Sequence, residues 1–176
     1  KFMLSDVGAS EENKTRFLRE AEALANLKHP NIVQVHDIGV SEAGYFFVMD
    51  YVEGMSLSEY MMIMGEDFTL EDRIRMMLKV LDAIHFGHQL GLMHRDLKPG
   101  NIMINNQSEP VVVDFGLVDD NAALDSKIET EEIMGTPQYM APEQVTGATG
   151  EIGPITDVFA LGVIFYELVT GKKPFT

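Results

Sequence analysis

The sequence predicts an α+β fold, in which helices and antiparallel strand pairs alternate along the chain. Two observations carry this prediction. Apolar residues recur at helical spacing in several long stretches, and strand-like runs come in neighbouring pairs joined by short polar links. The chain has 176 residues, of which 45% are hydrophobic and 23% charged, so it can bury a core as one domain or part of one.

The first third of the chain is predicted to hold a helix followed by a strand pair. Ser10 favours a helix start, and an apolar face continues to about residue 28, where Pro30 ends it. The runs 32–38 and 45–52 are rich in branched and aromatic residues, and a short Ser/Gly-containing link joins them. They are therefore expected to pair as antiparallel strands.

The next elements prepare a polar loop. A short helix is expected over residues 55–64, and Thr69 with Asp72 resembles a capping box at the start of a long helix that ends before Gly91. Four side chains indicate the apolar face of that helix: Ile74, Leu78, Leu81 and Ile84. Three further elements complete the prediction: strands at 101–105 and 110–114, and a helix at 156–170.

Charge and composition exclude several classes of function. The net charge of -15 argues against a nucleic-acid partner, which needs a basic surface. The most apolar segment, residues 158–169, is shorter than the roughly 20 residues of a membrane span, so we expect a buried helix and no membrane contact from this segment. The chain has no cysteine, and nothing at its start resembles a signal peptide, which suits a cytoplasmic location.

Four motifs stand in a fixed order along the chain. They are HRDLKPGN (94–101), DFG (114–116), GTPQYMAPEQ (135–144) and TDVFALG (156–162). Together they resemble the eukaryotic-type protein kinase family, and the neighbouring stretches look most like its bacterial serine/threonine members. The resemblance runs through nearly the whole chain.

The resemblance implies a two-lobed fold that is truncated at both ends. Residues 1–52 correspond to a remnant of the small lobe, and residues 53–176 to a mainly helical large lobe. The first two strands with their glycine-rich loop are expected to be absent, as are the last helices. Glu143 would then lack the later arginine with which it pairs in the family.

The same resemblance assigns catalytic roles to the loop residues. Asp96 would be the catalytic base and Lys98 would face the transferring phosphate, while Asn101 and Asp114 offer oxygen atoms that suit Mg²⁺. Taken alone, each of these residues is ordinary in a turn or a loop. His94 is expected to be a buried structural histidine, stacked with Leu24 and Phe115 and anchored by Asp157.

ATP would contact a second group of residues. Lys1 and Glu20 are expected to form the ion pair that reaches the phosphates, although Glu20 could instead form an exposed helical pair with Arg16. The adenine site is expected from Met49 as gatekeeper, the backbone of Asp50 and Val52, and Met103 as part of the floor.

Regulation is expected in the polar stretch 118–132, which reads as a long loop. Arg95 would pair with a phosphate on Thr130, with Ser126 as the second candidate, and self-association would allow autophosphorylation. Thr136 would contact Asp96 near the substrate.

The function that follows is transfer of the ATP γ-phosphate to Ser/Thr hydroxyl groups of proteins. Three alternatives stay open: a pseudokinase or scaffold, a small-molecule phosphotransferase, and a fragment without activity of its own. Retention of all four catalytic polar residues argues against the first, and GTPQYMAPEQ argues against the second.

Overall fold

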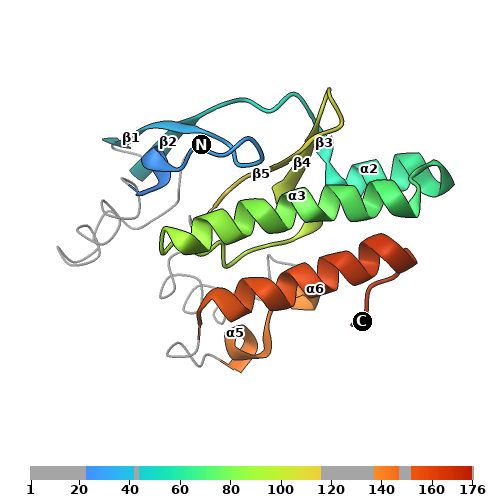
Figure 1. Cartoon of the computed structure of the whole chain (residues 1–176). Coiled ribbons are helices and arrows are strands. Elements are labelled where there is room, and N and C mark those ends of the chain that lie inside the picture. The colour runs from blue at the N-terminus through green and yellow to red at the C-terminus, as the bar shows by residue number, and fades with distance from the viewer. Residues whose placement is uncertain (1–22, 42–43, 116–136, 147–151, 176) are drawn as a thin grey trace.

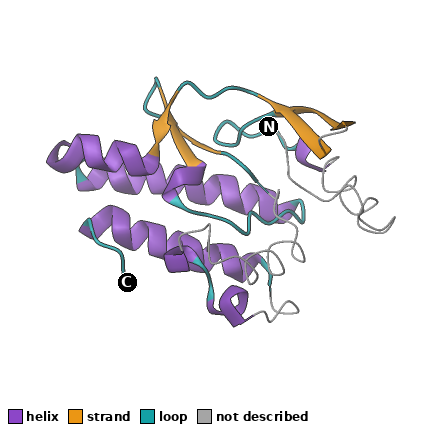
Figure 2. Cartoon of the chain, turned by 180° about the vertical axis from the view of Figure 1, so that it is seen from behind, coloured by secondary structure: helices purple, strands orange, loops and turns teal. Residues whose placement is uncertain are grey.

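The computed structural model describes residues 23–41, 44–115, 137–146 and 152–175. Strands cover one side of the long helix α3 (Leu70–Gln89), and helix α6 (Pro154–Thr170) lies along its other side (Figures 1 and 2). The mixture of helices with antiparallel strands agrees with the α+β prediction. Helix α3 is therefore the central layer, and the polar loop at 94–101 follows its C-terminal end.

The expected strand pair in the first third of the chain is present. Strand β1 (Val35–Ser41) pairs antiparallel with β2 (Gly44–Met49), and residues 23–26 are the described part of the preceding helix. That helix ends earlier than the expected residue 28, and both strands are shifted from the expected bounds. The segment directly before β1 was predicted to be part of the first strand. It is a loop that forms hydrogen bonds with the rest of the core.

This loop fixes the strand pair to the core of the molecule. The Asn31 side chain donates to the carbonyl of Pro110 at 2.7 Å, and the amide of Val33 donates to the carbonyl of Val112 at 2.9 Å. The amide of Val112 in turn donates to the carbonyl of Asn31 at 2.8 Å. These bonds pair residues 31–33 with β5 and explain why the strand predicted at 32–38 begins later.

A second sheet has the strand order β3-β4-β5. Strand β4 (Ile102–Asn105) lies between β3 (Gly54–Ser56) and β5 (Pro110–Val112), and both pairings are antiparallel. Strands β4 and β5 were predicted from the sequence. Most of β3 was instead assigned to the helix predicted at 55–64. Gly54 allows this strand because an added Cβ would stand 1.9 Å from the carbonyl oxygen of Ile104.

Helix α2 (Leu57–Met64) begins later than predicted because Ser56 is its N-cap. The Ser56 amide donates to the Glu59 carboxylate at 2.8 Å, and the Glu59 amide donates to the Ser56 hydroxyl at 3.3 Å. This is a complete capping box, which fixes the first turn of the helix. A short 3-10 turn, Gly65–Asp67, then leads to α3.

The start of α3 is as predicted, but its buried face is not. The Thr69 hydroxyl accepts from the amide of Asp72 at 3.2 Å, as expected of an N-cap. Ile84 is buried, whereas Ile74, Leu78 and Leu81 are exposed by 40%, 60% and 41%. The buried residues of α3 are Met76, Met77, Val80, Ala83, Ile84 and Gly87. Apolar residues lie on most sides of this helix, so their periodicity alone did not identify the buried face.

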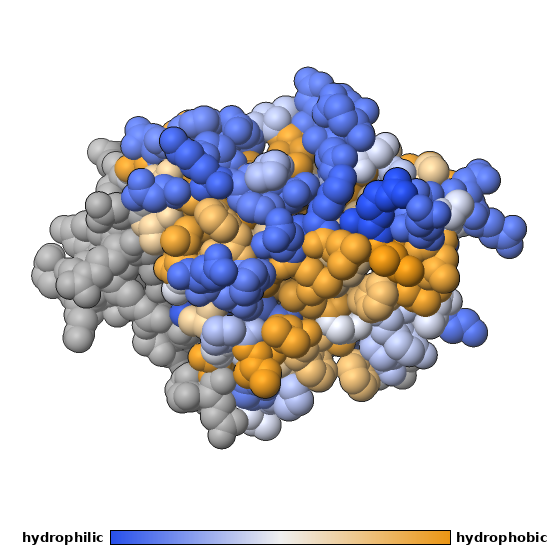
Figure 3. Space-filling model, in the orientation of Figure 1, coloured by the Kyte–Doolittle hydropathy of each residue, from blue (hydrophilic) through white to orange (hydrophobic). Residues whose placement is uncertain are grey.

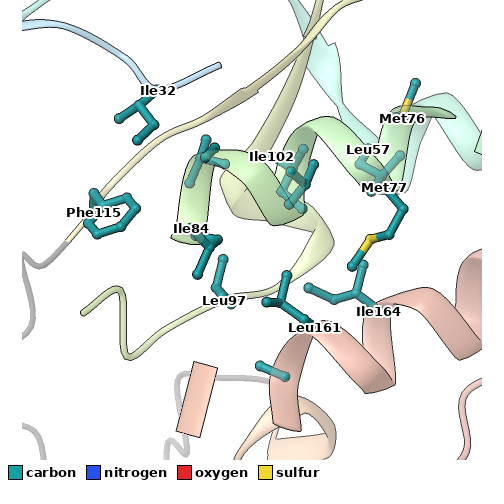
Figure 4. Close-up of a cluster of buried hydrophobic side chains, with 14 of the residues drawn as sticks. Ile32, Leu57, Met76, Met77, Ile84, Leu97, Ile102, Phe115, Leu161 and Ile164 are labelled. Carbon is teal, nitrogen blue, oxygen red and sulfur yellow. The ribbon is translucent and has the colours of Figure 1, made fainter. Parts of the chain in front are cut away.

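Helix α6 packs against α3 through a continuous apolar core. Side chains from the strands, α3 and α6 point toward one another in this cluster (Figure 4). Exposed apolar side chains also gather over α3 and α6 on the outer face (Figure 3). In the part of the chain that the structure describes, no helix has both the length and the apolar character needed to cross a membrane.

Three short elements complete the described chain. They are the 3-10 turns Pro99–Asn101 and Pro137–Tyr139 and helix α5 (Pro142–Thr146). Helix α6 ends at Gly171, whose φ of 70° is the left-handed conformation that favours glycine at a helix end. The turn at 99–101 leads directly into β4, which positions the polar loop discussed next.

Candidate active site

Antiparallel pairing of β4 with β5 brings the two main polar motifs together. Residues 94–101 precede β4, and residues 113–115 follow β5. Because Ile102 is opposite Val112, the end of the first motif lies beside the start of the second. The amide of Val113 donates to the carbonyl of Asn101 at 2.9 Å, which extends the pairing by one step.

Asp96 is the centre of a small polar cluster in this loop. Its Oδ2 atom lies 2.6 Å from Lys98 Nζ and accepts from Asn101 Nδ2 at 3.1 Å. Asn101 Nδ2 also donates to the Asp96 carbonyl at 2.8 Å. The side chains of Asp96 and Lys98 are 31% and 29% exposed, so a substrate group can reach the carboxylate.

His94 lies beneath this cluster and is fully buried. Its Nε2 atom is 2.9 Å from the Val113 carbonyl, and its Nδ1 atom accepts from the Asp96 amide at 3.3 Å. These partners fix the neutral tautomer that carries its hydrogen on Nε2. Burial lowers the pKa of His94, although the carboxylates of Asp157, Asp96 and Asp114 act to raise it.

The three carboxylates that influence this imidazole include both acidic residues of the predicted site. Asp96 and Asp114 come from different motifs, yet both lie close enough to affect His94. The prediction that His94 is a buried structural residue is confirmed. Burial favours the neutral form of the His94 ring in this surrounding of carboxylates.

Asp157, at the start of α6, holds the backbone of the loop. Its Oδ2 atom accepts from the His94 amide and its Oδ1 atom from the Arg95 amide, both at 2.8 Å. Arg95 has a φ of 65°, a left-handed conformation that is unfavourable for a residue with a side chain. The buried carboxylate of Asp157 therefore supports a strained backbone directly before Asp96.

Phe115 packs inward next to His94. The two ring centroids are 5.3 Å apart, and Phe115 is buried. Phe115, Leu24, Met49 and Asp114 all line one small cavity behind the strand pair. Leu24 and Phe115 thus belong to one buried apolar cluster, and His94 joins the expected stack through its ring contact with Phe115.

Gly87 on α3 provides the space for the Phe115 ring. A Cβ atom added to Gly87 would stand 2.2 Å from Phe115 Cζ, a distance that real Cβ atoms do not show. No signal in the sequence indicated this contact, because glycine inside a helix has no single structural meaning. Both Gly87 and its neighbour His88 were missed as contributors to the site.

The segment after residue 136 closes the other side of the loop. Gln144 Nε2 donates to the Arg95 carbonyl at 2.7 Å, and the Thr156 hydroxyl donates to Glu143 at 2.7 Å. Glu143 thus has a hydrogen-bond partner other than the arginine that the family resemblance implies. The Tyr139 hydroxyl donates to Glu167, and burial raises the pKa of Tyr139, so this phenol remains a donor.

The donor atoms at the site fit a hard divalent cation. Both hydrogen-bond partners of Asn101 Nδ2 are oxygen atoms, which leaves Asn101 Oδ1 as the atom that can face a cation, together with the half-buried carboxylate of Asp114. Within the described ranges, no group of three His, Cys, Asp or Glu residues could hold a metal by protein atoms alone. Phosphate groups or water could supply further ligands.

The residues predicted to contact ATP are only partly described. Met49, Val52 and Met103 are half-buried, and Asp50 is exposed. The amide of Asp50 donates to the Gln34 carbonyl at 3.0 Å, so a nucleotide would use the carbonyl of Asp50. Lys1, Glu20, Arg16, Ser126, Thr130 and Thr136 lie outside the described residues.

Comparison with known proteins gives consistent matches. The family described as "Protein kinase domain" matches residues 1–176. The chain is 38% identical to the probable serine/threonine-protein kinase PknB of Bifidobacterium longum, with 100% of this chain and 26% of the relative covered. It is 37% identical to the serine/threonine-protein kinase PrkC of Bacillus subtilis, with 99% and 26% covered. The chain thus spans about a quarter of these relatives.

A solved structure shows the same fold. The kinase domain of Mycobacterium tuberculosis PknI superposes with a TM-score of 0.73 at 29% identity, over 96% of this chain and 60% of that one. The chain therefore resembles a large part of a kinase domain in both sequence and fold.

Proposed function

The chain belongs to the protein kinase domain family, and from this premise we propose that its parent protein transfers the γ-phosphate of ATP to Ser/Thr hydroxyl groups of proteins. One observation carries the proposal. The Asp96 carboxylate, the Lys98 ammonium and the Asn101 amide form one hydrogen-bonded and partly exposed cluster beside Asp114. A scaffold would not need this cluster to stay accessible.

Each residue of the cluster has a role that suits its chemistry. Asp96 orients the attacking hydroxyl and accepts its proton as the oxygen bonds to phosphorus. Lys98 stabilises negative charge on the phosphoryl oxygen atoms as the bond to the ADP oxygen breaks. The hydroxyl proton moves to Asp96, and ADP leaves with the electrons of the broken bond.

Asn101 and Asp114 would hold Mg²⁺, which neutralises phosphate charge when bound. Met49, Met103 and the backbone of Asp50 and Val52 would contact the adenine, and Lys1 with Glu20 would contact the phosphates. These assignments follow the family pattern. Met49 and Met103 are half-buried, which supports an apolar surface for the adenine ring of ATP.

Control by phosphorylation is part of the same proposal. A phosphate on Thr130 would pair with Arg95, and Thr136 would help to place the substrate near Asp96. Self-association of two copies would allow one to phosphorylate the other. Because ATP is the donor, this catalytic segment would act in the cytoplasm.

The decisive experiment measures phosphate transfer from Mg-ATP to a protein substrate by the full-length protein. Removing the base with Asp96→Asn should lower kcat by about 10²- to 10⁴-fold, since this is the usual contribution of general acid–base catalysis. Asp82→Asn is the matched control, because Asp82 is 73% exposed. Among the described residues it forms an ion pair only with His29, which is not part of the polar cluster around Asp96. Equal rates for Asp96→Asn and the unaltered protein would contradict the proposal.

A further inference from the structure

We infer that His88 is a positioning residue for phosphate transfer. Its imidazole holds the Asp157 carboxylate, and that carboxylate fixes the backbone immediately before Asp96. The kinetic part of this inference rests on the proposed function. Neither the sequence motifs nor the assigned site residues include His88.

The contact joins two helices at the buried base of the catalytic loop. His88 Nε2, on α3, lies 2.7 Å from Asp157 Oδ2, on α6. The Asp157 side chain is 1% exposed and that of His88 is 15% exposed. Water therefore has little access to the carboxylate, and its hydrogen bonds must come from the protein.

The hydrogen bonds to Asp157 are of two kinds. His94 and Arg95 supply backbone amides, and His88 supplies a side-chain imidazole nitrogen from another helix. Oδ2 accepts from both His88 and His94, so the imidazole and the loop backbone meet at one oxygen atom. A buried carboxylate with fewer donors is less favourable, because desolvation of the charge is then less well offset. His88 thus helps to hold the Asp157 carboxylate in place.

Displacement of Asp157 would reach the reacting atoms through the backbone. The left-handed conformation of Arg95, with φ of 65°, persists only while its surroundings hold it. Asp96 is the next residue, and its amide donates to His94 Nδ1. A loop that shifts at Arg95 therefore moves the Asp96 carboxylate, and catalysis is sensitive to misplacement on the order of 1 Å.

Substitutions of His88 can separate its hydrogen bond from its packing. His88→Gln keeps a donor at the position of Nε2, whereas His88→Phe keeps the ring volume without the donor. With the full-length protein, His88→Phe should lower kcat about 10- to 100-fold because misplaced catalytic groups lose this much. The KM for Mg-ATP should change by less than about twofold, since the nucleotide contacts are elsewhere. His88→Gln should recover most of kcat.

His85→Phe is the matched control on the same helix. His85 is exposed, and its hydrogen bond runs to Gln89 one turn further along α3. This variant should leave kcat and KM unchanged. It tests whether a phenylalanine in the last turns of α3 is harmful for reasons other than the loss of the bond to Asp157.

Amide hydrogen exchange gives a readout that does not depend on activity. In His88→Phe, the amides of His94 and Arg95 should exchange faster, while the amides in the middle of α3 and α6 keep their protection. His88→Gln should stay close to the unaltered protein. If His88→Phe does not fold, the comparison of His88→Gln with His88→Ala serves the same purpose.

The outcomes distinguish the inference from the proposed function. Unchanged kcat and unchanged exchange at His94 and Arg95 in a folded His88→Phe protein would overturn the inference. The same holds if His88→Gln is as impaired as His88→Phe, because the donor would then be irrelevant. If the unaltered protein transfers no phosphate, the proposed function fails, and the exchange experiment still decides the structural role of His88.

Discussion

The catalytic loop at 94–101 and the packed pair of helices α3 and α6 are held by different forces. A few hydrogen bonds to buried polar groups, above all Asp157 and His94, fix the loop. The helices are held by a broad cluster of apolar side chains. Apolar burial is non-directional, whereas hydrogen bonds set positions. The helices should therefore control stability, and the polar bonds should control the geometry of the site.

The largest expected effect on stability comes from the apolar region. Ile164 on α6 is completely buried against the core. Ile164→Ala should lower the free energy of unfolding by about 2–5 kcal/mol, because it removes apolar burial and leaves a cavity. In the fraction that stays folded, kcat should remain within about twofold, since no polar contact of the loop is lost. Urea unfolding and steady-state kinetics measure the two quantities.

Ile155→Ala on the same helix is the control for this substitution. Ile155 is 69% exposed, so its truncation should change the free energy of unfolding by less than about 0.5 kcal/mol. If Ile164→Ala reduced kcat as strongly as Asp96→Asn while the protein stayed folded, the proposed division between stability and geometry would be wrong.

A smaller loss of stability with a larger effect on the site is expected at Gly87. Gly87→Ala places a methyl group where the Phe115 ring now lies, at 2.2 Å from Cζ. Overpacking of this kind costs about 1–3 kcal/mol. The ring must move, and Asp114 is its neighbour in the chain, so kcat should fall as well. Thermal unfolding and phosphate transfer by the same preparation test both expectations.

Gly162→Ala, in the middle of α6, makes the same change where there is room. Apart from its chain neighbours and the backbone of the same helix, no atom that the structure describes lies within 4 Å of the added methyl group. Alanine is the better helix former by up to about 1 kcal/mol, so this variant should be neutral or more stable. Equal behaviour of the two alanine variants would show that Phe115 adapts freely to the added methyl group at Gly87.

The sequence predicted those parts of the molecule that local signals determine. Thr69 marks the start of α3, and the branched runs mark the strand pairs, because caps and strand composition act over a few residues. The two motifs around Asp96 and Asp114 also show in the sequence through their residue types. Their closeness in space then follows from one antiparallel turn.

The contributions of Gly87, His88 and Thr156 could not be predicted in this way. Each acts through a contact with a distant residue, respectively Phe115, Asp157 and Glu143. The prediction that Ile74, Leu78 and Leu81 belong to the buried face of α3 was wrong for a related reason. When a helix is apolar on several sides, its burial is decided by neighbouring elements and not by its own periodicity.

The smallest effect, and the most specific test of the polar region, concerns the pH dependence contributed by His94. Burial lowers its pKa below the ordinary value of 6.5, although Asp157, Asp96 and Asp114 oppose the shift. Below about pH 6.5 the unfolded chain therefore binds a proton that the folded protein does not, and stability falls as the pH falls.

His94→Phe lacks this group, and it leaves the Val113 carbonyl and the Asp96 amide without a partner, at a cost of about 1–3 kcal/mol near neutral pH. Because the unaltered protein loses stability on acidification through this imidazole and the variant does not, the difference between them should narrow from pH 7 to pH 5. Urea unfolding at several pH values measures this difference. A constant difference would mean that His94 takes up protons equally in the folded and unfolded states, which would contradict a lowered pKa of the buried imidazole.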